Sequence, residues 1–137
     1  MKQVYLAHQL SAPTQVGIQA NIDNAKLWYR WACDHYWPDH CFNAMWILNC
    51  EVYDDANEHE RAMGMKRNLV HIKTCDELWL LGPSISRGML EEAEYAQRCG
   101  FPVRNLTGVE KPPKVRVWPA DMPTWQPGSV SQQQVLF

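Results

Sequence analysis

Short continuous apolar runs alternate along the chain with longer segments whose apolar positions have helical spacing. Residues 4–7 form the first continuous run, which is typical of a buried strand in a parallel sheet. Residues 76–82 form a second run that is closed by Gly82-Pro83, and this is the clearest predicted strand. A further strand is expected at residues 102–106, just after a proline.

Three helices are predicted between and after these runs. The first covers about residues 16–34, where apolar residues recur with helical spacing. The second covers residues 57–74, because Asn57 and Glu60 are spaced as a capping box. The third begins at the N-cap Ser86 and ends at Gly100.

Two segments leave alternatives open. Residues 36–51 permit either a second strand with its loop or part of a helix. The acidic stretch 51–60 is expected to be a solvated loop and helix cap, or else to approach the site of a neighbouring subunit. Met45, Trp46 and Trp79 are expected in the core rather than as base-stacking groups.

The alternation of strands and helices predicts an α/β fold with right-handed crossovers. We expect a Rossmann-like or flavodoxin-like doubly wound parallel sheet of four to five strands with flanking helices. This domain covers residues 1–108, and residues 109–137 form an extended C-terminal arm rich in proline. The arm also carries apolar residues that favour burial, so we expect it to pack on its own domain or on a neighbouring subunit and to fray after Gly128. Those apolar residues are Val115, Val117, Trp118 and Trp125.

Composition narrows the class of protein. A net charge of -2 argues against a nucleic-acid coat or an anionic membrane surface, because both require a basic face. No apolar run reaches the roughly 18 residues of a membrane span, and five cysteines without a Cys-x-x-Cys pair are typical of reduced thiols, so we expect a cytoplasmic protein. The seven tryptophans favour a homo-oligomer.

Ligands of open α/β sheets bind where strands end and helices begin, which makes the loop after Gly82 the main candidate site. Ser86 supplies a hydroxyl, Gly88 lets a ligand approach the backbone, and the first-turn amides form an anion site. Glu92 lies one turn further along. The alternative is ordinary capping, with Glu92 on a solvated acidic face.

We expect neither a metal nor a cofactor. Several histidines and cysteines lie close together in the sequence, but their spacing fits no standard closed zinc site. They are Cys33, His35, His40, Cys41 and Cys50.

The order of four motifs resembles the nucleoside 2-deoxyribosyltransferase superfamily over about residues 3–108. The motifs are Tyr5 in the first strand, residues 67–69 (Arg-Asn-Leu), residues 75–79 (Cys-Asp-Glu-Leu-Trp) and residues 86–92 (Ser-Arg-Gly-Met-Leu-Glu-Glu). The chain looks closest to a small, poorly characterised bacterial and phage branch. It is also similar to the deoxynucleoside 5′-monophosphate N-glycosidases.

The resemblance implies a nucleoside or nucleotide substrate and a role for each matched residue. Glu92 matches a nucleophile that attacks the anomeric carbon and expels the base, after which a second base or water attacks the glycosyl ester. Ser86 and Gly88, in the motif with Met89, match contacts to a phosphate or 5′-hydroxyl. Tyr5 matches a residue that lines the pocket.

Two positions depart from the family pattern. Asn68 stands where these enzymes carry an aspartate, and an amide cannot accept a proton, although it can bind a ribose hydroxyl. His8 follows the first strand in place of small residues, either as a proton donor or as a structural histidine. The sequence therefore leaves three functions open: an N-glycosidic-bond enzyme, a protein that binds a nucleotide signal without turning it over, or a structural or interaction protein that kept the scaffold and lost the pocket.

Overall fold

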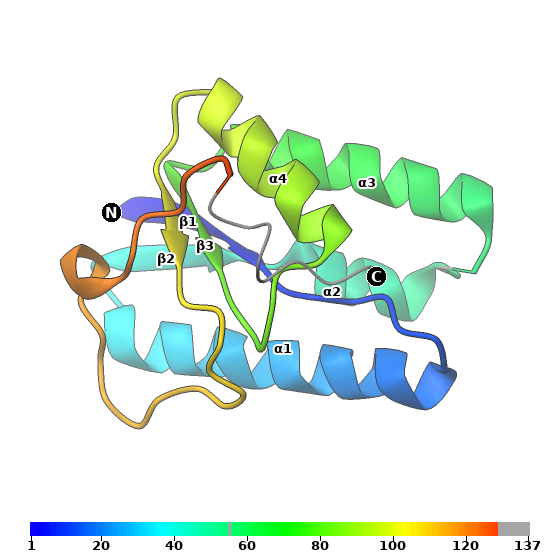
Figure 1. Cartoon of the computed structure of the whole chain (residues 1–137), viewed down its shortest axis with the longest axis horizontal. Coiled ribbons are helices and arrows are strands. Elements are labelled where there is room, and N and C mark those ends of the chain that lie inside the picture. Colours follow the sequence, from blue (N-terminus) through cyan, green and yellow to red (C-terminus); the bar gives the residue numbers. More distant parts are fainter. Residues whose placement is uncertain (55, 129–137) are drawn as a thin grey trace.

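The protein forms a parallel sheet between two layers of helices, as seen in the computed structural model, which describes residues 1–54 and 56–128 (Figure 1). Helix α1 covers one face of the sheet, and α3 and α4 cover the other. In chain order the elements are β1 (Lys2–Ala7), α1 (Gln15–Tyr36), β2 (His40–Asn43), α2 (Met45–Val52), α3 (Glu58–Lys73), β3 (Glu77–Leu80), α4 (Arg87–Arg98), β4 (Val103–Asn105) and a 3-10 turn η1 (Pro119–Asp121).

The four strands lie in the order β2-β1-β3-β4, and all their pairings are parallel. This confirms the expected α/β fold, since the order is that of a flavodoxin-like sheet with four strands. The chain leaves β1 for β2 on one side and reaches β3 on the other. That change of direction opens a crevice at the carboxyl ends of β1 and β3, where ligands of such sheets bind.

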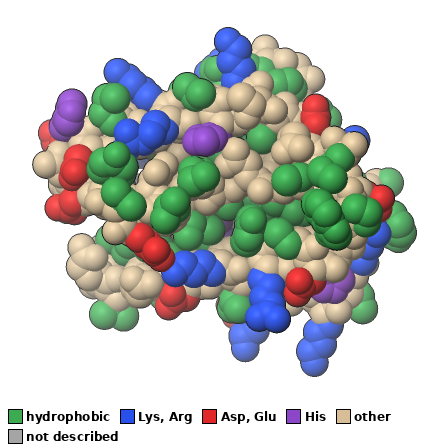
Figure 2. All heavy atoms as spheres, turned by 180° about the vertical axis from the view of Figure 1, so that it is seen from behind, with side chains coloured by type: hydrophobic (Ala, Val, Ile, Leu, Met, Phe, Trp, Pro, Cys, Tyr) green, Lys and Arg blue, Asp and Glu red, His purple; other side chains and the backbone are tan. Residues whose placement is uncertain are grey.

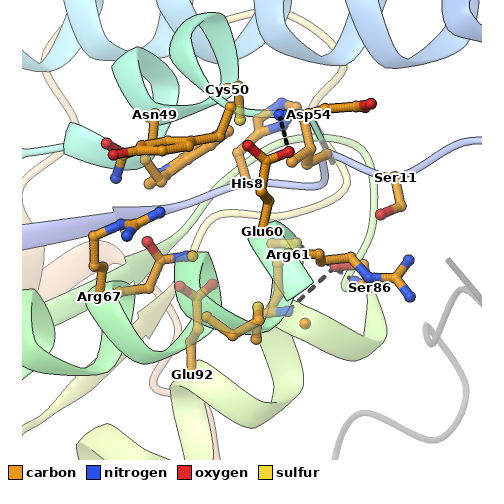
Figure 3. A pocket seen from close by; sticks show the side chains of 18 residues that line it. His8, Ser11, Asn49, Cys50, Asp54, Glu60, Arg61, Arg67, Ser86 and Glu92 are labelled. Carbon is orange, nitrogen blue, oxygen red and sulfur yellow. Dashed lines mark hydrogen bonds between the residues drawn. The ribbon is translucent and has the colours of Figure 1, made fainter. Parts of the chain in front are cut away.

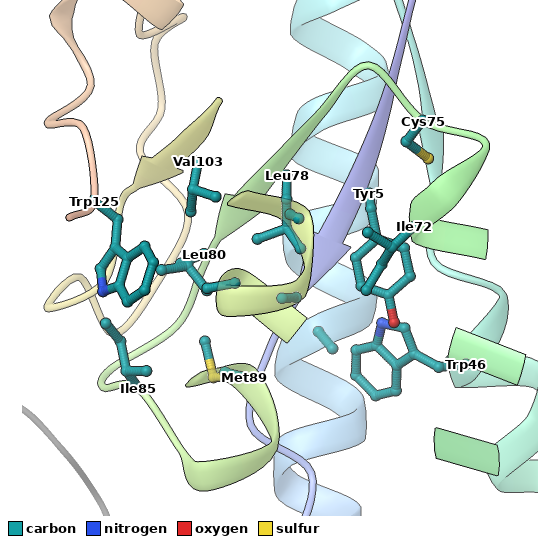
Figure 4. Close-up of a cluster of buried hydrophobic side chains, with 14 residues drawn as sticks. Tyr5, Trp46, Ile72, Cys75, Leu78, Leu80, Ile85, Met89, Val103 and Trp125 are labelled. Carbon is teal, nitrogen blue, oxygen red and sulfur yellow. The ribbon is translucent and has the colours of Figure 1, made fainter. Parts of the chain in front are cut away.

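The continuous apolar runs are explained by burial on both faces. In β1, Val4 and Leu6 face α1, where they pack in one core cluster with Trp28 and Trp31. Side chains alternate along a strand, so Tyr5 and the other odd positions face the opposite layer. The second cluster, shown in Figure 4, joins Tyr5, Ala7, Leu78 and Leu80 to residues of α3 and α4 such as Ile72, Met89 and Ala93.

The ambiguous segment 36–51 contains both a strand and a helix. The turn between β2 and α2 is closed by Asn43, whose side-chain oxygen accepts from the Met45 N–H at 3.1 Å. Trp46 and Trp79 are buried as expected. The expectation of a core position was wrong for Met45, which is 44% exposed because it starts α2 on the solvent side.

The predicted helix limits agree with the structure to within about two residues. Asn57 caps α3 by accepting from the Glu60 N–H at 3.1 Å. Only this half of the expected capping box forms. The Glu60 carboxylate accepts from the Asp54 N–H at 3.2 Å and not from the Asn57 N–H. Gly100 follows the end of α4 with φ of 85°, a conformation that favours glycine.

The C-terminal segment runs back along the sheet edge and enters both core clusters. Met122 and Trp125 are 2% and 1% exposed, and the N–H of Trp125 donates to the carbonyl of Val103 at 3.0 Å. The expected burial was wrong for Val115 and Trp118, which are 67% and 56% exposed. Trp118 instead offers its ring face to the Arg116 guanidinium at 4.0 Å. The expected fraying after Gly128 falls outside the residues that the structure describes.

Within residues 1–54 and 56–128, no helix has the length and apolarity that a membrane crossing requires. The five cysteines, all of which lie within the described residues, form no disulfide bond.

Candidate functional site

A cavity of about 130 Å³ lies at the carboxyl ends of β1 and β3 (Figure 3). Its walls come from the loop after β1, from α2 and α3, and from the first two turns of α4. The lining residues are His8, Leu10, Ser11, Trp46, Asn49, Cys50, Tyr53, Asp54, Glu60, Arg61, Gly64, Met65, Arg67, Asn68, Ser86, Gly88, Met89 and Glu92. The three segments that the sequence singled out therefore meet at one cavity.

Glu92 is a buried carboxyl group in the cavity wall, and it is 6% exposed. The Tyr5 hydroxyl donates a hydrogen bond of 2.5 Å to its Oε2 from beneath, out of the core. Burial raises the pKa of Glu92 to about 7, although the bond from Tyr5 acts in the opposite direction. Burial also raises the pKa of Tyr5 well above its ordinary value, so this phenol remains a donor.

The start of α4 forms one end of the cavity. Ser86 accepts from the Met89 N–H at 3.2 Å, and the Met89 sulfur accepts from the Ser86 N–H at 3.4 Å. The Met89 side chain is thus occupied by the cap and the core. At Gly88 an added Cβ would meet no described atom within 4 Å, so the backbone of this turn faces open space. Amides in a helix's first turn have no intrahelical partner and suit an anion.

His8 lines the cavity, but both of its ring nitrogens are engaged. Nδ1 donates to the Gln9 carbonyl at 2.7 Å, and Nε2 lies 2.8 Å from the Asn24 side-chain amide, from which it accepts. Burial lowers the pKa of His8, which agrees with this neutral ring. The ring packs against Gly82, where φ is 96° and an added Cβ would lie 2.7 Å from Nε2. The structural interpretation of His8 therefore agrees better with its contacts than a proton donor does.

Helices α2 and α3 and the loop between them supply the side chains that the sequence interpretation missed. Asn68 lines the cavity as expected, and Asp54 and Glu60 bring two further carboxyl groups from the acidic stretch 51–60. The missed signal was the spacing along α3, where Glu60, Gly64, Arg67 and Asn68 recur at helical intervals and share the face toward the cavity.

The structure places no metal site among these groups. Within the described part of the chain, no three His, Cys, Asp or Glu side chains are arranged to hold an ion.

The fold and the cavity define the class of protein, which is a flavodoxin-like domain with a buried carboxyl group in a cavity at the carboxyl ends of its strands. The chain belongs to the family described as a domain of unknown function, DUF7768, whose model matches residues 2–106. No curated protein and no solved structure matches the chain. The matched residues include every side chain that lines the cavity, whereas Met122 and Trp125 lie outside the match.

Proposed function

We propose that this protein is an N-glycosidic-bond enzyme that acts on nucleosides or nucleotides, either as a deoxyribosyltransferase or as a nucleotide N-hydrolase. One observation carries the proposal: the Glu92 carboxyl group is buried in a cavity wall and held through Oε2 by the Tyr5 hydroxyl. This arrangement leaves Oε1 for a ligand. The resemblance of residues 86–92 to the deoxyribosyltransferase motif supports the same role for Glu92.

The proposed reaction proceeds in two displacements at the anomeric carbon. Oε1 of the ionised Glu92 attacks C1′, and the bond from C1′ to the base nitrogen breaks, so the base leaves with the bonding electrons and takes up a proton. Water or a second base then attacks C1′ of the ester, and the bond from C1′ to Oε1 breaks and restores the carboxylate. The attacking group gives its proton to the general base that protonated the leaving base in the first step. The hydroxyl of Ser86 and the start of α4 hold the phosphate or 5′-hydroxyl.

Proton transfer in this reaction does not depend on Asn68. Asp54 and Glu60 line the same cavity, and either carboxyl group supplies the acid chemistry that an amide lacks. We assign Asn68 to a hydroxyl of the sugar, for which an amide is a suitable partner.

The test is base release from a panel of nucleosides and 5′-monophosphates, in ribose and deoxyribose forms, with and without an acceptor base. Glu92→Gln should abolish release. Glu91→Gln is the matched control, because Glu91 is the exposed neighbour on the same helix. Failure of the native protein to release base from any member of the panel would rule out this function.

A second candidate is a protein that binds a nucleotide signal without turning it over. It is favoured by Asn68 in the cavity and by the fully engaged ring of His8. A nucleotide that binds only the folded protein would raise its melting temperature. Recovery of that nucleotide unchanged after long incubation would favour this candidate over the enzyme.

A nucleotide ligand and five cysteines outside any disulfide bond support a cytoplasmic location, which we propose for either function. The absence of nucleic-acid and membrane partners and the homo-oligomer remain predictions.

A further inference from the structure

Two side chains of the cavity wall contain buried donors without an acceptor. Nδ2 of Asn49, on α2, and Nε of Arg67, on α3, are shielded from solvent and have no hydrogen-bond partner in the described part of the chain. Leaving such a donor unpaired costs about 1–3 kcal/mol, so each calls for an explanation. A ligand in the cavity would supply the missing acceptors after a small rotation of these side chains.

The guanidinium of Arg67 is held by an aromatic ring rather than by an acid. Its central carbon lies 4.4 Å from the centroid of the Tyr53 ring, and no ion pair joins it to a carboxylate among the described residues. The ring fixes the plane of the guanidinium and leaves its charge uncompensated. Such a group suits a flat ligand edge that carries acceptors.

The positions of these groups assign them to one part of the ligand. In Figure 3, Arg67 and Asn49 lie on one side of the cavity, Ser86 and Arg61 lie on the other, and Glu92 lies between them. If the 5′ end of the ligand is held at Ser86 and its C1′ lies over Glu92, the base reaches Arg67 and Asn49. This step rests on the proposed function.

We propose that Arg67 and Asn49 select a 6-oxopurine base. Guanine and hypoxanthine present two neighbouring acceptors, O6 and N7, whereas adenine presents N7 beside an amino donor that would face a donor of the protein. The proposal also fits the chemistry at Glu92. As the bond from C1′ to N9 breaks, its electron pair moves into the purine. The Arg67 guanidinium beside O6 and N7 then stabilises that negative charge.

The first experiment measures binding without turnover. Calorimetric titration of Glu92→Gln with dGMP, dIMP, dAMP, dCMP and 7-deaza-dGMP should give about tenfold tighter binding of dGMP and dIMP than of dAMP, the lower range for a bidentate pair. Loss of the N7 acceptor in 7-deaza-dGMP should weaken binding. Equal affinity for dGMP and dAMP, or tightest binding of dCMP, would overturn the assignment.

The second experiment adds substitutions to the Glu92→Gln background. Arg67→Met should remove the preference, and Asn49→Asp, which replaces a donor by an acceptor, should shift it toward dAMP. Lys66→Met is the control, because it removes the charge of an exposed neighbour on α3 that does not line the cavity. A preference for dGMP that survives Arg67→Met contradicts the proposal.

Turnover by the native protein separates this inference from the proposed function. Base release that does not discriminate between dGMP and dAMP overturns the base assignment alone. Selective binding of dGMP without release overturns the enzyme and keeps the assignment. Binding of none of the five nucleotides overturns both.

Discussion

Glu92 has two possible charge states near neutral pH, and the folded protein favours the protonated one. The pKa is about 7 in the folded chain, against 4.5 for an ordinary glutamate. The folded state therefore binds more protons than the unfolded state between these values. The contribution of protonated Glu92 to the stability of the folded protein is fully present below about pH 4.5. It is lost as pH rises through 7, and the total loss is about 3 kcal/mol.

A glutamine at this position cannot titrate and should remove that dependence. We expect the free energy of unfolding of Glu92→Gln, relative to the native protein, to increase by about 3 kcal/mol between pH 4.5 and pH 7.5. Urea unfolding of both proteins across this range measures the difference, in which other titrating groups cancel. A constant difference across the range would contradict the assigned pKa.

The Tyr5 hydroxyl stabilises the ionised form of Glu92, so its removal should change the pH profile of the reaction. In Tyr5→Phe the pKa of Glu92 should rise further, which shifts the acid limb of kcat/KM to higher pH. A hydrogen bond to a charged group contributes about 1.5 kcal/mol, so kcat/KM at pH 6 should fall about tenfold more than at pH 9. A uniform loss at all pH values would show that Tyr5 acts only through packing.

The sequence predicted individual residues unevenly. Ser86, Gly88, Asn68 and Glu92 line the cavity as expected. Tyr5 does not line it, because its ring lies in the core and only its hydroxyl reaches Glu92. The sequence did not identify Arg67 and Asn49 as unpaired hydrogen-bond donors. The neighbours of a polar residue along the chain do not reveal whether its side chain finds an acceptor in the folded structure. The bond between Tyr5 and Glu92 joins residues 87 positions apart, and only the packing of α4 against the sheet brings them together.

At the scale of elements, α4 is the part of the fold that positions the site. Ser86→Ala should cost about 1 kcal/mol of stability through the lost N-cap. Thr14→Ala is the control, because Thr14 caps α1 in the same way, by accepting from the Gly17 N–H at 3.0 Å. Urea unfolding should give similar losses, whereas calorimetry should show weaker dGMP binding in Ser86→Ala alone. Equal dGMP binding by both variants would show that the Ser86 hydroxyl caps α4 but does not contact the ligand.

Sequence patterns found the strands of the sheet centre and the three long helices because their periodicity or caps are local. The segment 36–51 stayed ambiguous because β2 has only four residues and α2 only eight. Segments this short show too little hydrophobic periodicity to distinguish a strand from a helix. Helix α2 was the costly omission. It carries Trp46, Asn49 and Cys50, and without it one wall of the cavity was missing from the interpretation.

At the scale of the whole molecule, the C-terminal segment belongs to the core. Trp125 is 1% exposed and packs in the cluster beneath α4, so Trp125→Ala should cost about 3–5 kcal/mol. Trp118→Ala should cost less than about 1 kcal/mol, because that ring is half exposed. Thermal or urea unfolding of the two variants makes the comparison. Equal losses would contradict the packing of Trp125.

We expect the predicted homo-oligomer to form through the far side of the molecule, the face opposite to that seen in Figure 1. Figure 2 shows hydrophobic side chains gathered in a band across this face. Beside β2, a groove of about 560 Å³ is lined by residues of α1, β2 and α2, and Met45 and Leu48 are among its exposed apolar members. Such a patch marks an interaction surface. Sedimentation should show self-association that Leu48→Glu abolishes, and a monomer at all concentrations would rule it out.

The segment after β4 also determines how many other chains one molecule can pair with through its backbone. The N–H of Asn105 donates to the carbonyl of Pro123 at 2.7 Å, and Arg104 forms a bridge with Thr124, so this edge of the sheet is already covered. Among the described residues, β2 is the edge strand without a neighbour on its outer side. A molecule with one open edge can form at most a closed pair. A chain that lost residues 119–128 would have two open edges, and repeated addition at both would produce a growing filament.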